Sequence, residues 1–269
     1  MGGLLIFGAG KMGGAMLQGA LKAGWRGSAI TVIEPHPAPD LLALGAAHGF
    51  VLNPAPEEAG TADLILLAIK PQMLDAASAR LKPLTHETSI VVSILAGKTI
   101  KDLKARLPGV CKLVRAMPNT PAAIGRGMTG VFATPDLTEA DKASVSRLLA
   151  TTGRVEWLPH EAWIDAVTAV SGSGPAYVFH MVEALAKAAE ALGLPADLAM
   201  TLARTTVEGA GELLHQNPAI PAATLRQNVT SPGGTTAAAL EVLMGQAGLA
   251  PLMVAAVAAA KKRAEALSG

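Results

Sequence analysis

The chain has 269 residues, of which 51% are hydrophobic and 16% are charged, a balance that excludes a disordered chain and can fill a sizeable core. Its length fits one large domain or two modest ones. The 22 Lys and Arg residues nearly balance the 21 Asp and Glu residues, and no basic block with interleaved aromatics indicates a nucleic-acid binder. Because Cys111 is the only cysteine, an internal disulfide framework is excluded and a reducing compartment is expected.

Two apolar segments could be mistaken for targeting or membrane segments. Leu4–Phe7 has no basic residue before it, and Gly8-Ala9-Gly10 follows at once, which is typical of a strand-to-helix turn rather than a signal peptide. The longest apolar run, Ala247 to Ala260, contains Pro251 and is shorter than the roughly 20 residues of a membrane span. We therefore expect a soluble, cytoplasmic protein.

The first half of the chain alternates short apolar runs with helical patterns. The runs are nearly continuous in Ile, Leu and Val, as expected of strands that helices cover on both faces. This alternation predicts an α/β domain with a doubly wound parallel sheet. The predicted strands are Leu4 to Phe7, Ala29 to Ile33, Asp63 to Ile69, Ser89 to Leu95, Cys111 to Arg115 and Thr129 to Ala133, with a helix over Met12 to Ala23.

The composition changes near residue 157, and no convincing strand follows Trp157. Pro195 stands at a helix start and Gly193 just past a helix end. We therefore divide the chain into a dinucleotide-binding α/β domain, residues 1–157, and an all-helical domain, residues 158–269. The predicted helices are Glu161 to Val170, Ala176 to Leu192, Pro195 to His215, Thr235 to Met244 and Leu249 to Leu267.

A glycine fingerprint, Gly8-Ala9-Gly10-Lys11-Met12-Gly13, follows the first strand and opens the first helix. In that context, Gly8 allows the tight turn, Gly10 lets the backbone approach a pyrophosphate, and Gly13 lets the helix pack closely on the strand. The helix N-terminus adds free N–H donors and a positive potential. The pattern predicts a dinucleotide site; the alternative is an ordinary glycine-rich turn.

Glu34 ends the second strand, about 20 residues after Gly13. A carboxylate there can accept hydrogen bonds from the ribose hydroxyls of NAD(H) and would repel the 2′-phosphate of NADP(H). The neighbouring cations His36 and Lys11 can partly offset that repulsion. The residue favours NAD(H) without deciding between NAD(H) and NADP(H), and the alternative is an exposed carboxylate without a role.

Further segments end strands at the same sheet edge, where ligands of such sheets bind. Lys70 lies in Ala68-Ile69-Lys70-Pro71-Gln72, beside the presumed nicotinamide half, although a lone Lys at a strand end is often only solvated. Ala96 and Gly97 follow the next strand and leave room for a dinucleotide. The prolines of Val114 to Pro121 fix a rigid loop near the same crevice.

The helical half holds two candidate loops. Ser171-Gly172-Ser173-Gly174-Pro175 is predicted to be a tight connection between helices, with its serines available as caps. Val229-Thr230-Ser231-Pro232-Gly233-Gly234-Thr235-Thr236 stands before an Ala-rich helix, where free N–H groups and two hydroxyls form a candidate nest for a carboxylate.

Together these motifs resemble pyrroline-5-carboxylate reductase, in order and spacing, over essentially the whole chain. The matching segments are GAGKMG at 8–13, AIKPQ at 68–72, VRAMPNTPA at 114–122, SGSGPAY at 171–177 and VTSPGGTTAAAL at 229–240, the last being the most specific. The resemblance implies a Rossmann-type domain followed by an all-α dimerisation domain, and NAD(P)H-dependent reduction of 1-pyrroline-5-carboxylate to L-proline.

The resemblance also implies the site residues. Thr236 matches the hydroxyl that stands near the substrate nitrogen, and is the expected catalytic residue; no metal is implied. The expected substrate-binding residues are Ser173, Gly233, Gly234, Thr235 and Thr236. The expected cofactor-binding residues are Phe7, Gly8, Ala9, Gly10, Lys11, Met12, Gly13, Glu34, Ala68, Ile69, Lys70, Pro71, Ala96, Gly97 and Asn228.

The sequence departs from the family pattern at two places. Many relatives carry a small polar residue where this chain has Glu34, and the loop Gln216 to Thr224 aligns poorly, so no substrate contact is transferred from it. The absence of a Ser/His/Asp set, a metal-ligand cluster or a carboxylate pair agrees with a mechanism of positioning, because a protonated cyclic imine is already a good electrophile.

Two other functions compete. The nearest rival is another two-domain reductase, either an imine reductase for other substrates or a 3-hydroxyacid dehydrogenase. A hydroxyacid dehydrogenase needs a general acid/base, typically a Lys of the helical domain, but Lys187 lies in the middle of an ordinary amphipathic helix. A non-catalytic scaffold would be expected to lose the Ser-Pro-Gly-Gly-Thr-Thr loop, which is intact. The apolar last helix requires partners around it, so we expect a homodimer, and the resemblance implies an active site shared between subunits.

Overall fold

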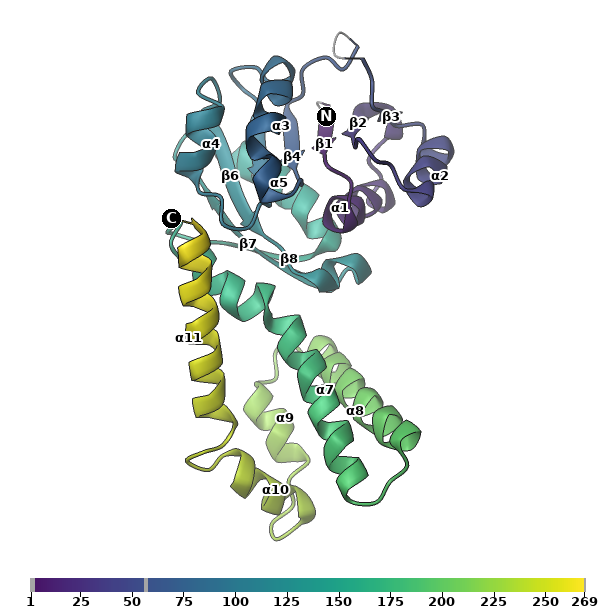
Figure 1. The fold of residues 1–269 in the computed structure, drawn as a ribbon, viewed down its shortest axis with the longest axis vertical. Helices are drawn as coiled ribbons and strands as arrows, with labels where there is room; N and C mark the ends of the chain where they lie inside the picture. Colours follow the sequence, from purple (N-terminus) through teal and green to yellow (C-terminus); the bar gives the residue numbers. More distant parts are fainter. Residues whose placement is uncertain (1–2, 56–57, 269) are drawn as a thin grey trace. The chain divides into compact units, whose positions relative to one another are not determined.

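The computed structural model describes residues 3–55 and 58–268 (Figure 1). By its internal contacts the chain divides into unit 1, Met1–Ser173 with Ala260–Gly269, and unit 2, Gly174–Ala259. The division predicted from composition, after residue 157, coincides with the end of the last strand, Gly153–Trp157. The contact-based boundary falls later, because the first helix after that strand packs against the sheet.

Unit 1 holds one sheet with the strand order β3-β2-β1-β4-β5-β6-β7-β8 (Figure 1). All neighbouring strands run parallel except β6 and β7, which are antiparallel. The strands are β1 Leu4–Phe7, β2 Ile30–Ile33, β3 Val51–Leu52, β4 Leu64–Leu67, β5 Ile90–Ser93, β6 Lys112–Met117, β7 Gly127–Ala133 and β8 Gly153–Trp157.

The predicted parallel sheet has one exception, β7, which pairs antiparallel with β6. The connection from β6 to β7 contains only the short 3-10 turn Thr120–Ile124. A parallel connection needs a crossover of a dozen or more residues, usually a helix, whereas a short loop returns the chain antiparallel. The predicted α/β class and the mostly parallel, doubly wound arrangement hold for the rest of the sheet.

Helices cover both faces of the sheet, and alternate strand residues supply two apolar clusters. One cluster holds Leu4 and Ile6 of β1 with residues of α1, Lys11–Lys22, α2, Pro39–His48, and α5, Glu139–Leu149. The other holds Leu5 and Phe7 with residues of α3, Leu74–Leu81, and α4, Ile100–Arg106. Burial on both faces explains why the strands read as continuous apolar runs.

Two strands escaped the sequence analysis. β3 has only two residues, and β8 carries Arg154 and Glu156, which interrupt an apolar pattern. After Trp157 the described residues contain helices and turns only, as predicted. These helices are α6 Trp163–Val167, α7 Gly174–Ala191, α8 Ala196–Gln216, α9 Ala222–Asn228, α10 Thr235–Leu243 and α11 Leu249–Ser268, of which α9 was not predicted.

The predicted connection at Ser171 to Pro175 is instead part of a nearly continuous helix. A π-helical turn, Thr168–Gly172, follows α6, and the N–H of Ser173 donates to the carbonyl of Thr168 at 2.8 Å. The serines therefore continue the helix rather than cap the next one. Single π turns within α-helices occur frequently at functional sites.

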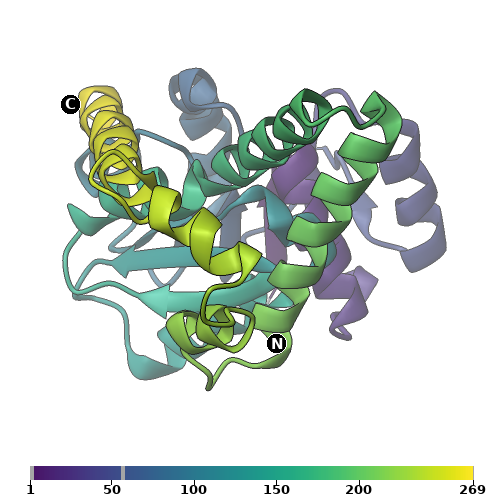
Figure 2. The ribbon, with the colours of Figure 1, turned by 90° about the horizontal axis from the view of Figure 1, so that it is seen from below.

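Unit 2 buries very little of its own surface. Helices α7 and α8 pack as a hairpin (Figure 2), but the buried residues described in unit 2 are only Ala186, Ala199 and Ala203. Large apolar side chains are exposed in the single chain, among them Phe179 at 64% and Val254 at 71%. Among the described residues, no helix combines the length and the apolarity required to cross a membrane.

Candidate functional site

The glycine fingerprint forms the turn from β1 into α1. Gly8 has φ +97°, its N–H donates to the carbonyl of Ile33 at 2.8 Å, and a Cβ there would lie 2.7 Å from the carbonyl oxygen of Ala68. A Cβ on Gly13 would collide with the carbonyl oxygen of Gly8. Both positions therefore require glycine, and the tight packing expected at Gly13 is present.

Gly10 differs from the other two glycines because nothing lies within 4 Å of a Cβ built on it. It is the N-cap of α1, with no side-chain hydrogen bond to the helix and no acidic residue in the first turn. The first N–H groups of an α-helix have no partner within the helix. Open space beside free donors at a positive helix end fits a pyrophosphate.

Glu34 follows β2 and points its carboxylate back at the glycine loop. Its Oε2 accepts from the N–H of Ala9 at 2.9 Å, and its Oε1 accepts from the N–H of His36 at 3.1 Å. Asn53 holds the backbone of Glu34 from both sides, accepting from its N–H and donating to its carbonyl, each at 2.8 Å. Asn53 was not predicted from the sequence; in the structure it has a positive φ of 49°.

The other expected cofactor residues of unit 1 lie along the same sheet edge, in the strand order β2, β1, β4, β5. Ala68 packs against the glycine loop, Lys70 is exposed, and Ala96 is exposed beside Gly97 after β5. The side chain of Phe7 belongs to the apolar core, where the residue is only 4% exposed. Phe7 can therefore reach a ligand only through its backbone.

Asn119 joins two motifs that the sequence analysis treated separately. Its Nδ2 donates to the carbonyl of Ser171 at 3.2 Å and to Ser171 Oγ at 3.3 Å, and its Oδ1 accepts from the N–H of Met128 at 2.9 Å. A Cβ on Gly172 would lie 2.8 Å from Met117 Cε. The π turn is thus fastened to the carboxyl end of β6.

The loop before α10 lies in unit 2. The N–H of Gly234 donates to the carbonyl of Ser231 at 3.0 Å, and Gly233 has φ +69°. Gly234 is the N-cap of α10 and provides no side-chain cap. The N–H groups at the start of α10 are therefore available to a carboxylate. Thr236 is half-buried there, and Asn228 is exposed at the end of α9.

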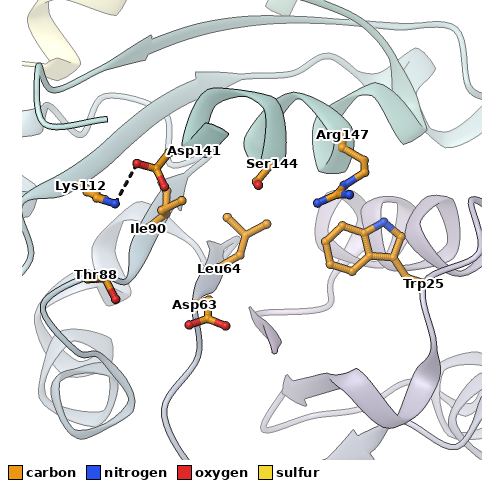
Figure 3. Close-up of a pocket in the computed structure, with 9 residues that line it drawn as sticks. All are labelled: Trp25, Asp63, Leu64, Thr88, Ile90, Lys112, Asp141, Ser144 and Arg147. Carbon is orange, nitrogen blue, oxygen red and sulfur yellow. Dashed lines mark ion pairs between the residues drawn. The ribbon is translucent and has the colours of Figure 1, made fainter. Parts of the chain in front are cut away.

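A separate hollow of about 300 Å³ lies at the opposite edge of the sheet (Figure 3). It is lined by the first residues of β4, β5 and β6, including Lys112, whose Nζ pairs with Asp141 at 2.8 Å, and by Trp25 beneath Arg147. None of the expected site residues lines this hollow. Ligands of parallel sheets bind at the carboxyl ends of strands, so this hollow is not the candidate site.

Two protein-family models match separate parts of the chain. The model for pyrroline-5-carboxylate reductase dimerisation matches residues 161–267, and the model for NADP oxidoreductase, coenzyme F420-dependent, matches residues 4–97. The second match contains the glycine fingerprint, Glu34 and the cofactor segments after β4 and β5.

Curated relatives match nearly the whole chain. The pyrroline-5-carboxylate reductase of Pasteurella multocida (strain Pm70) is 38% identical over 246 residues, which cover 90% of this chain and 90% of the relative. The pyrroline-5-carboxylate reductase of Glycine max is 36% identical over 263 residues, covering 97% of this chain and 94% of the relative.

Solved structures agree with these matches. A pyrroline-5-carboxylate reductase from Coxiella burnetii superposes with a TM-score of 0.91 at 34% identity, covering 100% of this chain and 99% of its own. A pyrroline carboxylate reductase from Plasmodium falciparum, solved with NADP bound, has a TM-score of 0.80 at 28% identity, covering 99% of this chain and 98% of its own.

Proposed function

The chain belongs to the pyrroline-5-carboxylate reductase family and is an NAD(P)H-dependent oxidoreductase of proline biosynthesis, and we propose that its own residues act chiefly by positioning the two reactants. The substrate, 1-pyrroline-5-carboxylate, is a cyclic imine that becomes L-proline. NAD(P)H, when bound, supplies the hydride that the imine carbon accepts. The observation that carries the proposal is the intact Ser231 to Thr236 loop, which opens α10 with free N–H groups.

The glycine loop and the strand ends of unit 1 are the proposed dinucleotide site. The free donors at α1 and the open space at Gly10 suit the pyrophosphate. Ala68 to Pro71 and Ala96 with Gly97 follow neighbouring strands and suit the remainder of the dinucleotide. Asn228 of unit 2 is assigned to the cofactor by the family resemblance alone.

The loop before α10 is the proposed substrate clamp. The backbone N–H groups of Gly233 to Thr236 hold the substrate carboxylate, and the Thr236 hydroxyl bonds the imine nitrogen. Ser173 is assigned to the substrate side with them. Orientation of a reactive iminium beside a hydride donor at about 3–3.5 Å needs no further acid/base group.

The direct test is turnover. The purified protein should oxidise both NADH and NADPH when 1-pyrroline-5-carboxylate is added, followed by loss of the dinucleotide's near-ultraviolet absorbance. Proline should accumulate in equal molar amount. Oxidation of the dinucleotide with a 3-oxo acid, but not with the cyclic imine, would instead support the alternative function, a 3-hydroxyacid dehydrogenase.

Thr236→Ala should lower kcat/KM for the imine by about tenfold to a hundredfold. Loss of one hydrogen bond in a buried site costs about 1–3 kcal/mol, and each 1.36 kcal/mol is about tenfold in rate. Dinucleotide affinity should change little. The matched control is Thr61→Ala, which removes the same hydroxyl from an exposed residue before β4, outside the proposed clamp. Full activity of Thr236→Ala would remove this hydroxyl from the mechanism.

Glu34→Ser should raise the preference for NADPH over NADH by about tenfold, because the variant lacks the carboxylate that repels the 2′-phosphate. A tenfold change in preference corresponds to about 1.4 kcal/mol. The ratio of the two kcat/KM values is the measurement. Asp40→Ser makes the same charge change at the exposed start of α2 and should leave the ratio unaltered. An unchanged ratio in Glu34→Ser would mean that Glu34 does not face the ribose.

We also propose that the working form is a homodimer in which the Ser231 to Thr236 loop of one subunit completes the site of the other. The family model for dimerisation over residues 161–267 and the exposed apolar faces of unit 2 support this assembly. We propose a cytoplasmic location for the protein. The free thiol of Cys111 supports it, because such thiols persist in a reducing compartment.

A further inference from the structure

Arg115 on β6 is a guanidinium buried inside unit 1, where the residue is only 3% exposed. Its Nη1 lies 3.2 Å from Glu161 Oε1, and its Nη2 lies 3.3 Å from Asp165 Oδ1. Nη2 also donates to Ser268 Oγ at 3.2 Å, and that hydroxyl donates to Asp165 Oδ1 at 3.1 Å. One buried cation therefore joins β6, α6 and the last residues of α11.

Stability alone does not account for this cluster. Desolvation of buried charges offsets much of their attraction, and apolar replacements of such clusters are often neutral or stabilising. In addition, the Nε of Arg115 is buried without a hydrogen-bond partner among the described residues, which carries a further cost. The cluster does, however, fix the relative positions of the segments that it joins.

Glu161 connects the cluster to α4, the helix that follows the expected cofactor residues Ala96 and Gly97. Its Oε1 accepts from the N–H of Ile100, the first residue of α4, at 2.7 Å. A carboxylate at a helix N-terminus satisfies a free donor and interacts favourably with the helix dipole. Arg115 thus holds the carboxylate that anchors the far end of the cofactor loop.

The last turn of α11 covers the same loop from another direction. A Cβ on Gly97, which has φ +70°, would lie 2.7 Å from the carbonyl oxygen of Leu267 and 3.1 Å from its Cβ. Ser268, the next residue, is held by Arg115 and Asp165. Arg115 also lies opposite Ser93, the last residue of β5, in the register of the sheet.

We propose that Arg115 is a positioning residue for the dinucleotide: through Glu161 and the last turn of α11, it holds the loop Ile94 to Gly97 in the conformation that binds NAD(P)H. The inference rests on the proposed function, because that function places Ala96 and Gly97 at the dinucleotide. Arg115 touches neither reactant in this account. It acts through α4 on one side of the loop and through Leu267 on the other.

The test uses Glu161→Gln and Ser268→Ala, which weaken the cluster at its two ends. Replacing Arg115 itself would leave the buried carboxylate of Asp165 and the half-buried carboxylate of Glu161 without their cation, which risks unfolding. The dissociation constant of NAD(P)H should rise about threefold to tenfold in each variant, within the range by which residues without ligand contact alter binding. The KM of the imine and the melting temperature should stay close to those of the parent protein.

Amide hydrogen exchange provides an independent readout. Exchange at Gly97 to Ile100 should become faster in Glu161→Gln, because the anchor on the Ile100 N–H is weakened. Glu265→Gln is the matched control: it breaks an ion pair with Lys261 on α11 at 2.9 Å without touching Arg115. Dinucleotide affinity and exchange in that variant should equal those of the parent.

Unchanged dinucleotide affinity in both cluster variants would overturn the proposal. Equal damage to dinucleotide affinity, imine KM and melting temperature would also overturn it, because that pattern indicates a general structural role. Failure of the proposed function is distinguishable, since the parent protein would then not reduce the imine at all.

Discussion

The double substitution Val254→Glu with Val257→Glu should abolish both the dimer and the activity. Val254 is 71% exposed in the single chain, and both residues lie in the apolar part of α11 that belongs to unit 2. If two copies cover this helix, each new carboxylate would be buried at the interface, at a cost of several kcal/mol. At about 1.4 kcal/mol per tenfold, the dimer should weaken by at least a thousandfold.

The physical case for pairing is the shortage of core in unit 2. Its described buried residues are three alanines, whereas Phe179, Leu252 and Val242 are each more than 60% exposed. An exposed apolar surface of this extent is a typical interaction site, and closed two-fold dimers are the commonest assembly. Because the proposed substrate loop completes the site of the other subunit, a monomer should also be inactive.

Light scattering and turnover should be measured on the same samples. The parent protein should have twice the 27.3 kDa mass of one chain, or a higher multiple, and the double variant should have that of one chain. Ala140→Glu with Ala143→Glu adds the same charge to exposed positions of α5 in unit 1 and should keep both the assembly and the activity. A fully active monomer would contradict the shared site.

The sequence predicted the parts of the fold that depend on local patterns. The strands of the mostly parallel core were identified because helices bury both of their faces, which leaves an uninterrupted apolar run. The glycine turn was identified because each of its constraints lies within a few residues. By contrast, β8 was not predicted because Arg154 and Glu156 interrupt its apolar pattern. The antiparallel direction of β7 was not predicted either, because it depends on a connection that is too short for a crossover helix.

The parts of the site that escaped prediction depend on contacts between distant residues. Asn53 supports Glu34 from another strand end, and Asn119 meets Ser171 across the interval between two separate motifs. Arg115 meets Ser268 near the opposite end of the chain. No periodicity or spacing signals such pairs, since each residue taken alone resembles an ordinary polar residue in a loop or strand.

The contrast between Gly10 and Gly13 gives the sharpest test of the dinucleotide site. Gly13→Ala should lower the melting temperature by several degrees and eliminate measurable dinucleotide binding. Its Cβ would collide with the carbonyl oxygen of Gly8, where the backbone cannot yield easily. Overpacking costs about 1–3 kcal/mol, and a chain of this size loses roughly 2–4 °C of melting temperature per kcal/mol.

Gly10→Ala should leave the melting temperature nearly unchanged and still weaken dinucleotide binding by about tenfold to a hundredfold. A Cβ at Gly10 meets nothing within 4 Å, so the free protein tolerates it. The small loss of N-cap preference is offset by the lower entropy of the unfolded chain. In the complex, however, the methyl group would occupy the space that the pyrophosphate needs. Parent-like affinity in Gly10→Ala, measured by titration with NADH and NADPH, would place the pyrophosphate elsewhere, because no other property of this position depends on an empty side-chain volume.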